Sequence, residues 1–180
     1  MHGTGAGYTR IMLTNYHTHS DFCDGRATMR VMAEAAREAG FSILGFSSHA
    51  PLPFGTTWNM PMEKLSDYVR TIRGLGREYA PSMEVLAGLE IDFIDGLCGP
   101  ADGRFSGAGL DYALGSAHFV TPRGAPAPSA SALDAAGAPT FGFAVDEPED
   151  DFEAHLKTFY DGDAEALVDD YYAAVTACVK

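Results

Sequence analysis

Four short apolar runs, separated by segments of helical periodicity, constrain the fold of this chain more than any other feature. The runs cover residues 11–16, 43–47, 85–89 and 112–116. Each run is too short for a helix and is followed by polar residues, so each predicts a β-strand. Strands that alternate with helices predict an α/β protein with a largely parallel sheet or barrel.

Three segments predict helices. The first repeats apolar residues at helical spacing, with Thr28 as a candidate N-cap and Gly40 where a C-cap glycine belongs. Its apolar positions are Val31, Met32, Ala35, Ala36 and Ala39. Residues 65–79 form the second amphipathic pattern, and one further helical region runs from about Glu149 to Val179.

The remaining segments predict connections. Residues 1–10 indicate a flexible leader, and 11–180 the length of a single domain. Residues 51–61 form a loop rich in proline and aromatic residues, and 95–109 a glycine-rich connection. Residues 121–139 are of low complexity in alanine, proline, serine and glycine, which is typical of an insertion loop.

Charge and cysteine usage restrict the classes of function. The net charge of −13 argues against nucleic acid or a membrane surface as partner, although bound cations would still permit an anionic substrate. Cys23, Cys98 and Cys178 lie far apart, as expected of a reduced cytoplasmic protein. No stretch approaches the ~18 apolar residues of a transmembrane helix, and residues 1–10 lack a signal-peptide core.

Four of the six histidines come just after predicted strands: His17, His19, His49 and His118. Glu90 occupies the same kind of position, and Asp24 lies in the first turn. Ligands of α/β folds bind at the carboxyl ends of the strands, so these side chains are expected on one rim. Imidazole and carboxylate groups suit zinc, iron or manganese, and a set this large suits more than one ion.

Each of these residues also has a simpler interpretation when it is taken alone. A histidine beside a strand is more often a capped residue than a ligand. Asp24 is a normal Asp-Gly turn residue, and Glu90 could be a solvated strand end. The joint pattern favours a site. His2 in the leader and His155 on a polar helix are assigned no role in it.

Four segments resemble the polymerase and histidinol phosphatase (PHP) family. They are HTHSDFCDG at 17–25, GFSSHAPLPF at 45–54, GLEIDF at 88–93 and DYALGSAHF at 111–119. Their residues are most similar to the histidinol-phosphate phosphatase branch of that family. The stretch 145–172 also fits this branch, although it is less specific.

The resemblance implies a distorted (β/α)7 barrel with two or three divalent metal ions (zinc, iron or manganese) at the strand C-termini. By position it assigns the metal ligands His17, His19, Asp24, His49, Glu90 and His118. Glu90 matches the carboxylate that bridges two ions, and Glu90 and His118 are the candidate catalytic residues.

Relatives also carry a Gly-His-x-Asp and an Asp-x-His segment beyond the region that matches residue 180. The resemblance therefore implies an incomplete barrel of about four strands plus flanking helices, from a truncated or a naturally reduced form. Residues 11–180 would be the N-terminal part of a PHP-like phosphoesterase domain. An open barrel would expose a strand edge through which the chain could form a homo-oligomer.

The activity implied is hydrolysis of L-histidinol phosphate to L-histidinol and phosphate in histidine biosynthesis. Two alternatives stay open: another PHP phosphoesterase acting on a small phosphate monoester, and an inactive metal-binding fragment. A nuclease is disfavoured because the chain has no basic track.

Neighbouring polar residues are expected to support the ligands. Asp92 is a candidate to orient a ligand, with a solvated carboxylate as the alternative. Ser47, Ser48 and Ser116 are expected to hydrogen-bond to ligands rather than attack the substrate.

Overall fold

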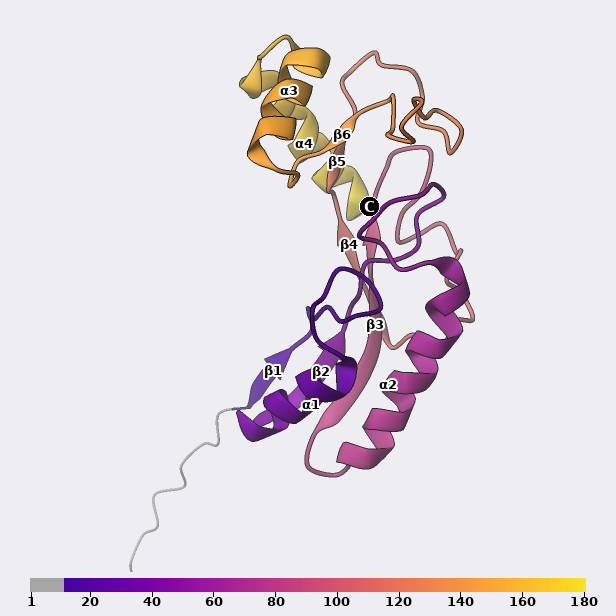
Figure 1. Ribbon diagram of the computed structural model, residues 1–180, viewed down its shortest axis with the longest axis vertical. Helices are drawn as coiled ribbons and strands as arrows, with labels where there is room; N and C mark the ends of the chain where they lie inside the picture. Colours follow the sequence, from indigo (N-terminus) through magenta and orange to yellow (C-terminus); the bar gives the residue numbers. More distant parts are fainter. Residues whose placement is uncertain (1–11) are drawn as a thin grey trace, which may run out of the picture.

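The computed structural model describes residues 12–180, so that His2 and the predicted leader lie outside the described residues. Four strands form a parallel sheet in the order β1-β2-β3-β4 (Figure 1). They are β1 Leu13–Asn15, β2 Phe41–Phe46, β3 Glu84–Asp92 and β4 Tyr112–Ser116. The predicted α/β fold with about four strands is confirmed.

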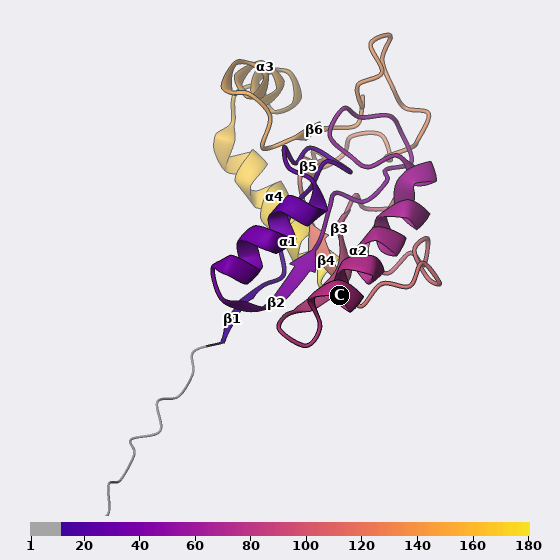
Figure 2. The same cartoon turned by 60° about the horizontal axis from the view of Figure 1, so that its bottom comes forward.

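Two helices, α1 (Met29–Glu38) and α2 (Leu65–Tyr79), cover one face of this sheet (Figure 2). The Thr28 side chain caps α1 by accepting a hydrogen bond from the backbone N–H of Val31, as the sequence predicted. Gly40 follows α1 with a φ of 84°, a conformation that favours glycine. A short 3-10 turn, η1 (Met62–Lys64), leads into α2.

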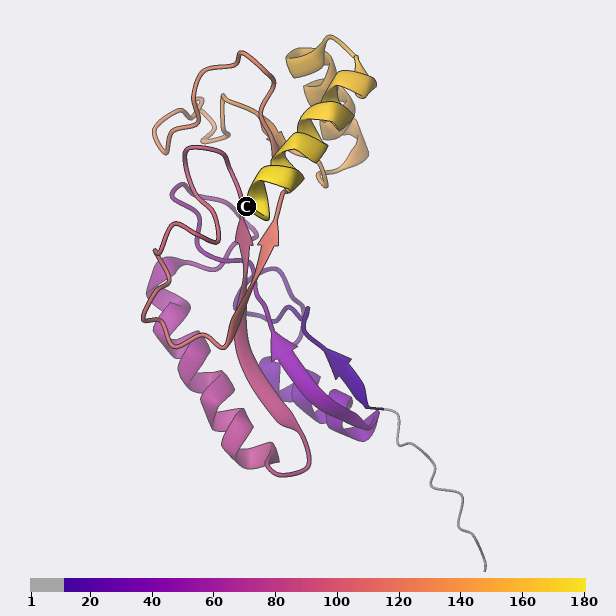
Figure 3. The same cartoon turned by 180° about the vertical axis from the view of Figure 1, so that it is seen from behind.

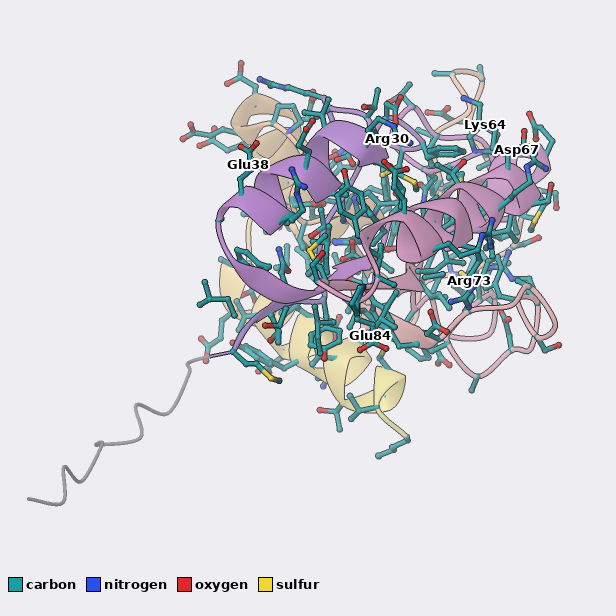
Figure 4. All side chains as sticks on the ribbon, turned by 90° about the horizontal axis from the view of Figure 1, so that it is seen from below. Arg30, Glu38, Lys64, Asp67, Arg73 and Glu84 are labelled. Carbon is teal, nitrogen blue, oxygen red and sulfur yellow. The ribbon has the colours of Figure 1, made fainter. Side chains whose placement is uncertain are left out.

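The outer surfaces of α1 and α2 are charged (Figure 4). Arg30 of α1 donates two hydrogen bonds, of 2.6 and 2.8 Å, to Glu78 of α2. Arg73 of α2 donates to both carboxylate oxygens of Asp111, just before β4, at 2.6 and 2.8 Å. These pairs tie the helices to each other and to the edge of the sheet.

Side chains of β3 alternate between the two faces of the sheet. Its odd-numbered positions, Val85, Ala87, Leu89 and Ile91, belong to the core shared with α1 and α2. Its even-numbered positions therefore point to the opposite face, and from 88 onward they are Gly88, Glu90 and Asp92. This opposite face is the one that α1 and α2 leave free (Figure 3).

The Tyr112 ring forms a floor across this free face. A Cβ added to Gly88 would lie 2.3 Å from Cζ of Tyr112, and one added to Gly45 would lie 2.3 Å from its Oη. The Tyr112 hydroxyl lies 2.7 Å from the carbonyl oxygen of Tyr16 and 3.1 Å from that of Phe46. Glycine is required on β2 and β3 because the ring of a β4 residue lies flat over both strands.

Several predicted bounds differ from the structure: β2 spans Phe41–Phe46 rather than 43–47, and two larger differences follow. Glu90 lies inside β3 rather than after it, because pairing with β4 continues to Asp92 and Ser116. The helical region 149–179 is two helices, α3 (Glu149–Tyr160) and α4 (Ala164–Cys178). Asp161 and Gly162 separate them with φ values of 54° and 86°, which a right-handed helix does not accommodate.

A two-stranded antiparallel ladder that the sequence did not predict joins β5 (Phe119–Val120) to β6 (Phe143–Ala144). Val120 and Phe143 pack with residues of α3 and α4 in a separate small core. Between these strands, 121–139 contains turns and one isolated bridge, Leu133 to Pro139. Within the described part of the chain, no helix has the length and apolarity needed to cross a membrane.

Tyr68 of α2 joins the helix to the sheet beneath the site. Its ring is fully buried, and its hydroxyl donates to the carbonyl of Gly88 at 2.8 Å and accepts from the N–H of Ser48 at 3.1 Å. We expect Tyr68→Phe to lower the free energy of unfolding by about 1–3 kcal/mol, because both backbone groups lose their partner in a buried place.

Urea denaturation would measure this loss, with Tyr172→Phe as the matched control. Tyr172 is 62% exposed, so its change should stay within about 0.5 kcal/mol. Equal effects of the two variants would contradict the structural role given to the Tyr68 hydroxyl.

Candidate metal centre

The carboxylate of Glu90 lies at the centre of four imidazoles. Its Oε2 is 3.0 Å from Nε2 of His17, 2.9 Å from Nε2 of His19 and 3.3 Å from Nδ1 of His49. Its Oε1 is 3.3 Å from Nε2 of His118. Residues that follow β1, β2 and β4 therefore meet Glu90, which lies near the carboxyl end of β3.

The segment that follows β1 supplies three of the predicted residues. His17 and His19 lie two residues apart in the sequence, and their ring centroids lie 5.2 Å apart. Asp24 returns to the same place, because the N–H groups of Cys23 and Gly25 both bond to the carbonyl of Ser20. Its Oδ1 lies 2.9 Å from Nδ1 of His19.

Gly25 closes this turn. A Cβ at Gly25 would lie 2.5 Å from the backbone nitrogen of Ser20, so no larger residue fits there. Asp24 also reaches toward His49, with 3.7 Å between Oδ2 and Nε2. The structure thus brings all six sequence-predicted residues together.

Asp92 holds His118. It is buried at the end of β3, and its Oδ1 accepts a hydrogen bond of 2.6 Å from Nδ1 of His118. The alternative of a solvated carboxylate is therefore wrong. With its Nδ1 proton committed to Asp92, His118 presents Nε2 to Glu90, where Ser116 Oγ also lies at 3.0 Å.

The other two serines behave differently from Ser116. Ser48 Oγ lies 3.4 Å from Ser20 Oγ, and Ser47 makes no hydrogen bond to any of the six predicted residues. Of the three serines predicted to hydrogen-bond to ligands, only Ser116 does so.

Residues of this centre fit divalent metal ions. Three overlapping groups have potential ligand atoms within 4.8 Å of one another: His17, His19 and Glu90; His19, Asp24 and His49; and His49, Asp92 and His118. Nδ1 of His49 lies 3.3 Å from Glu90 Oε2 without the geometry of a hydrogen bond, and Oδ2 of Asp92 is also buried without a hydrogen-bond partner in the described part of the chain. Unpaired buried polar atoms are costly, and a cation would satisfy both.

The pKa values of the centre also indicate a site that favours positive charge. Burial alone would raise the pKa of Glu90, but hydrogen bonds to His118, His19 and His17 outweigh it and hold this pKa well below the usual range. The Cys23 thiol and then Glu90 raise the pKa of His19 to about 10. Burial opposes the charged form of His118, yet Asp92 and Glu90 raise its pKa to about 10. Without metal, protonated His19 and His118 therefore supply positive charge beside the carboxylates of the centre.

Metal binding must displace these protons, because only a deprotonated nitrogen can bind a metal ion. His19 and His118 carry pKa values near 10, so both are protonated at pH 8 without metal. We expect zinc or manganese to bind more tightly as the pH rises from about 6 to 9, with release of up to about two protons. Calorimetry in buffers of different ionisation enthalpy would count them, and a heat independent of the buffer would contradict the prediction.

Trp58 closes one side of the centre. Its ring centroid lies 4.9 Å from that of His49 and 5.9 Å from that of His118. The sequence offered no periodic signal for this residue, which belongs to the loop 51–61 that was expected only as a connection. Aromatic enrichment of that loop was the one available indication.

A curled parallel sheet with overlapping histidine and carboxylate clusters at its strand ends defines an α/β protein with a candidate metal centre. The family model of the PHP domain matches residues 15–178. The chain therefore belongs to the PHP domain family.

Two curated relatives carry the name histidinol-phosphatase. A Deinococcus radiodurans protein named probable histidinol-phosphatase is 33% identical over 111 residues, which are 60% of this chain and 43% of the relative. The Bacillus subtilis histidinol-phosphatase is 36% identical over 87 residues, which are 43% of this chain and 32% of that protein. The matches thus span less than half the length of these curated relatives.

The fold also has a solved counterpart. A Listeria monocytogenes crystal structure, provisionally named a histidinol phosphatase, superposes with a TM-score of 0.69 at 21% identity. The match covers 91% of this chain and 60% of that one. At 21% identity the match shows only that the two chains share a fold. The four-stranded sheet belongs to that shared fold.

Proposed function

We propose that this protein is a metal-dependent phosphatase that hydrolyses L-histidinol phosphate to L-histidinol and phosphate in histidine biosynthesis. The observation that carries the proposal is the convergence of four imidazoles on the Glu90 carboxylate. The names of the two curated relatives supply the substrate. The net charge of −13 supports a small-molecule partner over a nucleic acid or an anionic membrane.

Two or three divalent ions (zinc, iron or manganese) would be held by the six predicted ligands, with Asp92 as a further candidate. When bound, such ions neutralise phosphate oxygens and lower the pKa of water from about 15.7 toward 7. Glu90 and His118 are the proposed catalytic residues, because Glu90 is common to the imidazoles and His118 is fixed by Asp92. The Trp58 ring packs edge-on against the rings of His49 and His118.

Phosphate release from several monoesters, with each metal supplied in turn, tests the proposal. We expect L-histidinol phosphate to be hydrolysed faster than glycerol phosphate or phenyl phosphate. Equal rates would favour a phosphoesterase of different specificity. Bound metal without any turnover would favour a metal-binding fragment.

We also propose self-association through the edge of the sheet. Within residues 12–180, strand β1 pairs with β2 alone; Leu13 in the strand and Met12 just before it are 42% and 63% exposed. Unpaired strand edges next to apolar side chains favour pairing between chains. We expect light scattering at high protein concentration to show dimers or larger species, and a clean monomer would contradict this.

A further inference from the structure

A cavity of about 290 Å³ lies next to the candidate metal centre. Its walls come from the loop 51–61, from the strands β5 and β6, and from residues 136–139 of the low-complexity segment. The side chains that characterise it are Phe54, Trp58, Phe119, Phe143, Glu147 and His155. Four are aromatic hydrocarbon rings or indole, and the only carboxylate among the described lining residues is that of Glu147.

Trp58 connects this cavity to the centre. Its indole lines the cavity, lies 4.9 Å from the His49 ring and 5.9 Å from the His118 ring, and is 6.0 Å from the Phe119 ring, all between centroids. A small molecule with one end at His49 and His118 would therefore extend along the indole toward the cavity.

The cavity is suited to a positive charge. The Glu147 side chain is 17% exposed, and its Oε1 accepts a hydrogen bond of 2.6 Å from Nδ1 of His155. Its Oε2 makes no hydrogen bond within residues 12–180, so it is available to a ligand. No lysine or arginine belongs to the described lining.

Its surroundings reinforce this preference. Glu147 lies in an acid-rich stretch that begins at Asp146 and continues through Glu149, Asp150 and Asp151 at the start of α3. Aromatic faces attract cations through the negative potential of their rings, and a carboxylate adds a charge-assisted hydrogen bond. Together they form a pocket that distinguishes an ammonium group from a neutral one.

We propose that this cavity receives the positively charged end of the phosphate ester and that Glu147 determines specificity for that charge. The inference rests on the proposed function, which places the phosphate of the same molecule at the metal centre. It gives residues 136–139 a role as one wall of a substrate pocket.

Binding can be measured without catalysis, because Trp58 is the only tryptophan of the chain and lines the cavity. The metal-free full chain is titrated with L-histidinol and with N-acetyl-L-histidinol, which lacks the ammonium charge. We expect L-histidinol to change the Trp58 emission saturably and to bind at least about tenfold more tightly than the acetylated probe.

Glu147→Gln keeps the shape of the side chain and removes its charge. We expect it to weaken L-histidinol binding at least about tenfold, with Glu153→Gln, an exposed carboxylate of α3, as the unchanged control. If the enzyme turns over, Glu147→Gln should lower kcat/KM for L-histidinol phosphate by a similar factor and leave phenyl phosphate within about twofold.

Three results would overturn the proposal: no saturable emission change, equal affinity for the two probes, or unchanged affinity in Glu147→Gln. Should Glu147→Gln misfold by circular dichroism, the comparison of the two probes on the wild-type chain still decides. Binding of L-histidinol without phosphate release from any ester would contradict the proposed function and leave the assignment of the cavity standing.

Discussion

Glu90→Gln should strip the protein of its metal ions. The carboxylate lies within 3.3 Å of nitrogens from four histidines, so it is the group that these four imidazoles have in common. An amide of the same shape has no negative charge to attract cations. Changes to groups that merely orient metal ligands already weaken binding about 10–100-fold, and we expect at least the upper end of that range here.

Metal content after dialysis, measured by plasma mass spectrometry, would show this loss. Glu84→Gln is the matched control, because Glu84 is exposed at the other end of β3 (Figure 4). Both variants should retain the circular dichroism of the wild type. A Glu90→Gln protein that retains as much metal as Glu84→Gln would show that the ions bind elsewhere.

Gly88→Ala should destabilise the fold by about 3 kcal/mol, the upper part of the range for overpacked cores. The added Cβ would lie 2.3 Å from the Tyr112 ring, which the backbone carbonyls of Tyr16 and Phe46 hold by its hydroxyl. The ring cannot move away without breaking the link between β4 and the end of β1. His17 follows that end directly, so the strain reaches the candidate centre.

Thermal and urea unfolding would measure the effect, with Gly74→Ala as a control of opposite sign. A Cβ at Gly74 in α2 meets nothing within 4 Å, so alanine there should stabilise the helix by about 0.5–1 kcal/mol. In a Tyr112→Ala background the cost of Gly88→Ala should fall sharply. An unchanged cost in that background would exclude the Tyr112 ring as its cause.

Periodicity in the sequence was sufficient to predict the sheet and its two covering helices. The strand 112–116 and the helix 65–79 occur with the predicted bounds, and the strands around 43–47 and 85–89 occur with shifted ends. Hydrophobic spacing predicts these elements because the apolar positions are the ones that the fold buries. The extension of β3 to Asp92 had no such signal, since it depends on pairing with β4.

Local backbone geometry set the other limits. The break between α3 and α4 depends on the positive φ of Asp161, and a two-residue ladder such as β5 and β6 is too short to show any period. Features of one or two residues are too short to produce a periodic pattern in the sequence, so neither could be predicted.

The candidate centre could be predicted because histidines and acids gathered at strand ends. Asp92 was accessible through its spacing of two residues from Glu90, although only the structure shows it buried against His118. Trp58 and Glu147 could not be predicted, because both lie in irregular segments that tertiary packing brings to one cavity, and only Trp58 also contacts the centre.

Anomalous X-ray diffraction from crystals grown with manganese or zinc tests the central claim most directly. Data collected on both sides of the metal absorption edge locate bound ions independently of the protein coordinates. We expect two or three peaks among the carboxylate of Glu90 and the imidazoles of His17, His19, His49 and His118. Peaks elsewhere, or none at saturating metal, would contradict the assignment of this centre.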